Sequence, residues 1–114
     1  MQHQSVHGRL MAREMVEPTR ALNRIVEQII RPMYGRLCGI VKALAGPRAT
    51  LAQIEASAKS VVGQCLFYKH CSAVLERLEG RRPEARDLDA LADHIVDFSL
   101  HAIRGIASRP RKST

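Results

Sequence analysis

The stretch that most constrains the fold is residues 60–68, S-V-V-G-Q-C-L-F-Y, which has helical spacing around it and carries no charge. At about 100° per residue, the surrounding helix has two apolar faces. The first face contains Ile54, Ala58, Val61, Cys65 and Tyr68. The second face, roughly opposite, contains Ser60, Gly63, Phe67, Cys71, Val74 and Leu78. A helix that is apolar on nearly all sides is buried on nearly all sides. We therefore expect the first face to pack within the chain's own bundle and the second face to meet another molecule.

Apolar residues recur at i+3/i+4 spacing along the whole chain, and no segment has the alternation of a strand. Thr50 and Gln53 have the spacing of a capping box, and Gly80 suits the end of the helix that they begin. Pro32 lies inside an apolar helical pattern and removes a backbone N–H, so we expect a kink near residues 28–31. The pattern predicts four helices, over about residues 6–16, 19–44, 50–79 and 85–108. The fold class is therefore all-α, an antiparallel bundle of about four helices whose last two form a long pair.

The length of 114 residues suggests one domain, over residues 10–108, between a lead-in (1–9) and a basic tail (109–114). The longest charge-free apolar stretch is far shorter than the ~20 residues of a membrane span. The first residues lack the apolar core of a signal peptide. Three cysteines at irregular spacing are typical of reduced thiols. Together these features predict a cytoplasmic protein that does not cross a membrane.

The formal net charge of +7 makes nucleic acid a candidate partner. In the second predicted helix, one stripe opposite the apolar side carries Arg20, Arg24, Glu27 and Arg31. Glu27 has the i,i+4 spacing of a surface ion pair with Arg31. No aromatic residues alternate with these arginines, as proteins that bind single strands require. A solvated face is the favoured interpretation, and a phosphate-binding face is the alternative.

Four runs occur in order along the chain: L-M-A-R-E-M-V-E-P-T (10–19), I-R-P (30–32), residues 60–68, and D-H-I-V-D-F-S-L (93–100). Together they resemble the C-terminal domain of TetR/AcrR-type transcriptional regulators of the CecR-like branch, over roughly residues 8–107. The resemblance implies an all-helical domain that forms homodimers through its last two long helices and binds a small effector inside. In that family an N-terminal helix-turn-helix domain reads operator DNA. Nothing before residue 10 has room for that domain's three helices, so operator DNA is expected as a partner only through a domain that this sequence lacks.

Polar groups on apolar helix faces are the candidate effector contacts. Glu14 lies in the apolar arc of the first helix, where a carboxylate needs a basic partner or a donor. An ion pair with Arg13 or Arg31 is one interpretation, and a polar anchor in an effector pocket is the other. Gln64 lies between the two faces of its helix and either bonds another helix or orients a ligand. The candidate ligand-binding residues are Met11, Glu14, Met33, Gln64 and Phe67.

The last predicted helix has a broad arc of apolar and small residues, which we expect to be buried against more than one neighbour. This arc contains Leu88, Leu91, Ala92, Ile95, Val96, Phe98, Ser99, Ala102, Ile103 and Ile106. In the preceding helix, Gly63 would allow close approach of a partner, because a glycine inside a helix costs ~1 kcal/mol that packing must offset. The candidate dimer contacts are Ser60, Gly63, Phe67, Cys71, Val74, Leu78, Ile95, Phe98, Ser99 and Ala102.

Catalytic and metal sites are not expected. His94, Asp97 and His101 share one side of the last helix, but it is the polar side, which favours a solvated face over a metal site. No nucleophile is placed with a base, and there is no glycine-rich phosphate loop. We therefore expect neither an enzyme nor a cofactor. The predicted function is a ligand-sensing and dimerisation domain of a TetR-like regulator, with a small, largely apolar effector. The alternatives are a small basic helical nucleic-acid-binding protein and a dimerisation module without a ligand.

Overall fold

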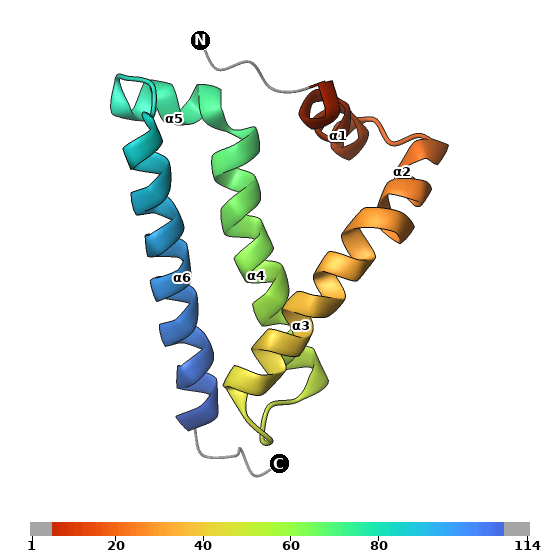
Figure 1. Cartoon of the computed structure of the whole chain (residues 1–114), viewed down its shortest axis with the longest axis vertical. Helices are drawn as coiled ribbons and strands as arrows, with labels where there is room; N and C mark the ends of the chain where they lie inside the picture. The colour runs from red at the N-terminus through yellow and green to blue at the C-terminus, as the bar shows by residue number, and fades with distance from the viewer. Residues whose placement is uncertain (1–5, 109–114) are drawn as a thin grey trace. The chain divides into compact units, whose positions relative to one another are not determined.

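A computed structural model of the chain describes residues 6–108, and these residues form helices and no strand (Figure 1). The elements are α1 (Val6–Val16), α2 (Arg20–Ile25), the π-helical turn η1 (Val26–Ile30), α3 (Arg31–Ala45), α4 (Leu51–His70), α5 (Ser72–Glu79) and α6 (Ala85–Ser108). The predicted all-α class is confirmed. The predicted basic tail and residues 1–5 of the predicted lead-in lie outside the described residues.

The chain divides into two compact parts, residues 1–36 and residues 37–114. The first part holds α1, α2, η1 and the first turns of α3. The second holds the rest of α3 together with α4, α5 and α6.

In the first part, a π-helical turn lies where the sequence predicts a kink. The helical path from α2 through η1 into α3 is continuous, and the Arg31 N–H bonds the Val26 carbonyl five residues back. Pro32 has no N–H to donate, so the regular i→i−4 series of hydrogen bonds cannot run through this turn. A π turn is one of the ways a helix takes up such an interruption. The helix expected over residues 19–44 is present, but it contains a local change of hydrogen-bond register.

In the second part, α4 begins with the predicted capping box. The Gln53 N–H donates to the Thr50 hydroxyl at 3.1 Å, and the Thr50 N–H donates to the Gln53 side chain at 2.9 Å. These two bonds satisfy amides that have no partner inside the helix. The residue types at this helix start therefore predicted its local structure correctly.

The prediction of one helix over residues 50–79 is wrong. The helix breaks at Cys71, whose φ of −111° and ψ of 31° are not helical, and α5 leaves in a different direction from α4 (Figure 1). The hydrogen bonds continue across the break, because the Cys71 N–H reaches the Phe67 carbonyl and the Leu75 N–H reaches that of Cys71. One non-helical residue is enough to turn the chain, and no Gly or Pro marks it. Val74 and Leu78 therefore lie on α5 and do not extend the second face along α4.

The helices α4 and α6 run antiparallel side by side (Figure 1) and form the predicted pair, with α4 shortened by the break. The buried side chains of this part come from α3, α4 and α6 and are those of Val41, Ala45, Ile54, Ala58, Ile95, Ser99 and Ile103. After α3, Gly46 turns the chain with a φ of +84°, a conformation that favours glycine.

The expectation that the whole apolar arc of α6 is buried is wrong. Ile95, Ser99 and Ile103 form one buried stripe, whereas Ala92 and Ala102 are exposed. Val96 and Phe98, on the two flanks of that stripe, are each 58% exposed, and Leu88, in the first turn of α6, is 45% exposed. A helix that packs mainly along one stripe leaves the edges of a broad apolar arc uncovered.

Cys65 is also exposed, contrary to the prediction that it faces inward. At its level in α4 the side chain that reaches α6 is Gln64, and neighbouring residues on a helix point about 100° apart. Cys65 does share a face of α4 with the buried Ile54 and Ala58, as the helical spacing predicts, but that face is not covered at the level of Cys65.

Candidate functional site

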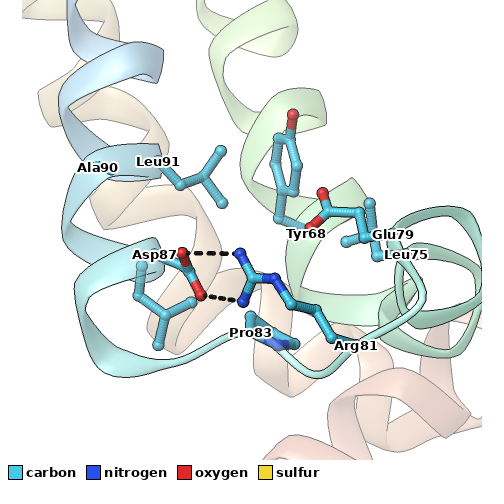
Figure 2. Close-up of a pocket in the computed structure, with 9 residues that line it drawn as sticks. Tyr68, Leu75, Glu79, Arg81, Pro83, Asp87, Ala90 and Leu91 are labelled. Atoms are coloured by element: carbon cyan, nitrogen blue, oxygen red, sulfur yellow. Dashed lines mark hydrogen bonds and ion pairs between the residues drawn. The ribbon is translucent and has the colours of Figure 1, made fainter.

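A cleft of about 310 Å³ opens at one end of the second part, between the end of α4, α5, the 80–84 loop and the start of α6 (Figure 2). Its volume is at the lower end of the range of ~300–1,000 Å³ for small-molecule sites. The wall is mainly apolar, with a few polar groups. The lining residues are Tyr68, Leu75, Glu79, Arg81, Pro83, Asp87, Leu88, Ala90 and Leu91. Tyr68 of α4 and Leu91 of α6 lie on opposite sides of the opening (Figure 2).

The cleft depends on how the chain passes from α5 to α6. Gly80 ends α5 with a φ of 75°, and its N–H bonds the Glu76 carbonyl at 2.8 Å. This left-handed conformation carries little cost at glycine and turns the chain at once out of the helix. The loop that follows carries Arg81 and Pro83, which line the cleft.

Asp87 fixes that loop to the first turn of α6. Its carboxylate accepts hydrogen bonds from both terminal nitrogens of Arg81, at 2.8 Å and 3.2 Å, drawn as dashed lines in Figure 2. It also accepts one from the Glu84 N–H at 2.7 Å. The bonds from Arg81, and next the one from the Glu84 backbone, lower the pKa of Asp87 to about 2. The same contact raises the pKa of Arg81, so both groups are charged at neutral pH.

Glu79 is the other ionisable carboxylate of the cleft. It has no hydrogen-bond or ion-pair partner among residues 6–108. Its charge interacts with Arg81, but the Arg81 guanidinium is already bound by Asp87. The two carboxylates and one guanidinium give the lining a net charge of −1.

In the first part, Glu14 joins α1 to the start of α2. Glu14 is only 4% exposed, and its carboxylate accepts from the Thr19 hydroxyl at 2.7 Å and from the Thr19 N–H at 2.8 Å. Hydrogen bonds from Thr19, with a smaller effect of Arg13, lower the pKa of Glu14. Arg31, one of the two ion-pair partners considered for Glu14, pairs instead with Glu27 at 3.0 Å. The structure thus supplies Glu14 with a donor that the sequence analysis did not identify.

Gln64 makes one of the two interactions considered for it. Its side-chain nitrogen donates to the Ser99 hydroxyl at 3.1 Å and joins α4 to α6. Phe67 is 43% exposed, and its ring meets that of Tyr68 edge to face with centroids 5.4 Å apart.

The five candidate ligand-binding residues are divided between the two parts. Met11, Glu14 and Met33 belong to residues 1–36, whereas Gln64 and Phe67 belong to residues 37–114, and none of the five lines the cleft. A role in ligand binding stays a prediction for each of them. The residues of the cleft were missed because the cleft lies where α5 turns away from α4 at Cys71, and no Gly or Pro marks that break in the sequence.

The candidate dimer contacts differ in exposure. Ile95 and Ser99 are buried inside the chain, and Cys71 is half-buried. The others are exposed: Ser60, Gly63, Phe67, Val74, Leu78, Phe98 and Ala102. On α6 the exposed candidates flank the buried stripe, so a partner could reach Phe98 and Ala102 without disturbing the bond between Gln64 and Ser99.

Within the described part of the chain, no three His, Cys, Asp or Glu side chains are grouped so as to hold a metal ion. None of the helices between residues 6 and 108 is long and apolar enough to cross a membrane.

The sequence matches a family model over residues 1–103, described as the C-terminal domain of the HTH-type transcriptional dual regulator CecR. Searches of the curated proteins and of the solved structures found no match.

Proposed function

The chain belongs to the family of CecR C-terminal domains, and on this basis we propose that it is the effector-binding and dimerisation domain of a TetR-type transcriptional regulator. The observation that carries the proposal is the family match, which spans 103 of the 114 residues. The all-α fold agrees with it. The proposal assigns no catalytic activity to the chain, places it in the cytoplasm, and leaves operator DNA to an N-terminal helix-turn-helix domain.

Exposed apolar side chains on α4 and α6 support dimerisation. The side chains are those of Val62, Phe67, Val96 and Phe98, each 36–58% exposed in one chain. The stretch of α4 that carries two of them, residues 60–68, has no charged side chain. Val96 and Phe98 lie on opposite flanks of the buried stripe of α6, so they belong to two different surfaces, and a two-fold dimer needs only one of these because it buries the same surface of both copies.

The cleft supports effector binding. It combines an apolar wall with a small number of polar groups, as small-molecule sites do. An effector acts on a regulator only if it binds two arrangements of the protein with different affinity. In an intact regulator, such a difference would change the separation or orientation of the DNA-reading domains.

A ligand screen by NMR tests the effector proposal. The ¹⁵N-labelled full chain is titrated with small, mainly apolar molecules that carry a positive, negative or zero charge. The proposal expects at least one class to give saturable shifts of backbone amides. The absence of any saturable binder would contradict the effector proposal and favour a dimerisation module without a ligand.

A further inference from the structure

The side chains that line the cleft carry more negative charges than positive charges. Asp87 engages both terminal nitrogens of Arg81, so the one cation of the lining already has its carboxylate partner. Glu79 has no such partner among the described residues. A ligand that enters the cleft therefore meets one carboxylate in excess.

The surroundings of Glu79 are largely apolar. Leu75, Leu88 and Leu91 line the same space, together with the ring of Tyr68. Electrostatic interactions are stronger beside apolar walls than in bulk water, because fewer water molecules screen them. An aromatic ring also attracts a cation that lies within ~6 Å of its face, by about 0.5–1 kcal/mol where the site is exposed.

An anionic ligand fits this cleft poorly. Asp87 already neutralises the Arg81 guanidinium through two hydrogen bonds, so an anion bound to the remaining N–H groups of Arg81 would bring a second negative charge beside that of Asp87. The net charge of the lining would also repel the anion. A neutral ligand avoids this repulsion but gains nothing from Glu79.

We propose that this cleft binds a small organic cation, in which a positively charged nitrogen lies near Glu79 and Tyr68 and an apolar body contacts the leucines. The cation is the class of effector for the domain, so this inference rests on the proposed function. The site lies entirely within residues 68–91 and requires no residue of the first part.

The test uses three probes of similar size, which are benzyltrimethylammonium, benzyl alcohol and phenylacetate. Each is titrated at low ionic strength into the ¹⁵N-labelled full chain. We expect saturable shifts of the amides of Tyr68, Glu79 and Leu91 with the cation, and weaker binding of the other two probes. Glu79→Gln should weaken the binding of the cation about two- to fivefold, in keeping with one cation–carboxylate contact at a partly exposed site.

The matched control is Glu76→Gln, which removes the same charge from the same helix at a position outside the cleft lining. Glu76 pairs with Arg82 at 3.5 Å, and its substitution should leave the binding of the cation unchanged. Equal losses in the two variants would contradict the proposal, because they would indicate a general effect of charge. A second variant, Tyr68→Leu, should also weaken the binding of the cation while the amide spectrum remains that of a folded protein.

The outcomes separate this inference from the proposed function. Tighter binding of benzyl alcohol or phenylacetate at the cleft, or shifts from the cation only elsewhere in the chain, would overturn the cation site and leave an effector domain. If no probe of any charge binds, the cation site is overturned, and if the chain is also monomeric in solution, the proposed function is contradicted as well.

Discussion

The side-chain nitrogen of Gln64 lies 3.1 Å from the hydroxyl of Ser99 and links the middle of α4 to the middle of α6. Ser99 is 8% exposed, so its hydroxyl has little access to water. The link lies between the buried Ile95 and Ile103 on one stripe of α6. It therefore fixes the register in which the two long helices pack.

Gln64→Ala should lower the free energy of unfolding by about 1–3 kcal/mol, because the Ser99 hydroxyl would remain buried without its partner. Urea denaturation followed by circular dichroism measures the change. Adding Ser99→Ala to the variant should cost less than the single changes predict, since the two residues act as a pair. Ser60→Ala is the control, because that hydroxyl bonds only the Ala56 carbonyl of its own helix. A double-mutant cycle with no coupling would show that the bond does not contribute to stability.

Thr19→Ala should destabilise the corner between α1 and α2. Thr19 caps α2 by accepting from the Ala21 N–H at 3.1 Å, and it also donates twice to Glu14. Loss of an N-cap side chain costs about 0.5–2 kcal/mol. Amide hydrogen exchange of residues 19–22 should become faster, whereas Thr19→Ser should retain slow exchange because it keeps the hydroxyl. If the two variants exchange alike, the hydroxyl has no role in the corner.

We expect the free energy of unfolding to fall in acid, because the Asp87 carboxylate becomes protonated. Its folded pKa of about 2 is below the ordinary value of 3.8, so the unfolded chain takes up the proton first as the pH falls. The stabilisation is complete above about pH 3.8 and is lost progressively between pH 3.8 and about 2. Observed by ¹³C NMR, the carboxyl should titrate near pH 2. In Arg81→Gln the midpoint should rise, and in Arg82→Gln it should not. A midpoint near 3.8 in the unchanged chain would contradict the observed contacts.

Binding to nucleic acid tests the alternative function. Arg20 and Arg24 are exposed and have no hydrogen-bond or ion-pair partner among the described residues, whereas Arg31 is paired with Glu27. A nucleic-acid-binding protein of this charge would lose affinity steeply as salt increases, through counterion release. We expect weak binding in fluorescence anisotropy with labelled duplex and single-stranded DNA, absent at 150 mM salt. Tight binding that falls with salt and is lost in Arg20→Gln and Arg24→Gln would favour the alternative.

Local features of the fold could be predicted from the sequence because they depend on neighbouring residues. The capping box at Thr50 and Gln53 and the left-handed Gly80 are examples, since the residue types alone favour these conformations. The apolar spacing likewise predicted the all-α class. It identified Ile54 and Ala58 as buried, because these positions face the interior wherever the helix packs.

The candidate site could not be predicted because it depends on contacts between distant segments. Cys71 and its neighbours include no Gly or Pro, and the basic Lys69 and His70 followed by Ser72 are only weak signals that α4 ends there. Without that break, Tyr68 and Leu75 would belong to one straight helix, and no cleft was expected between them. A helical wheel also gives the direction of a side chain but not what covers it, which explains the exposed Cys65 and Phe98.

The mass of the chain in solution tests the central claim most directly. Sedimentation equilibrium of the full chain should give twice the 12.7 kDa of one chain. Phe98→Asp should give 12.7 kDa, because it places a charge on the exposed apolar surface of α6. Val16→Asp, at an exposed apolar position outside the candidate dimer contacts, should remain a dimer. A monomer for the unchanged chain, or a dimer that survives Phe98→Asp, would contradict dimerisation through this surface.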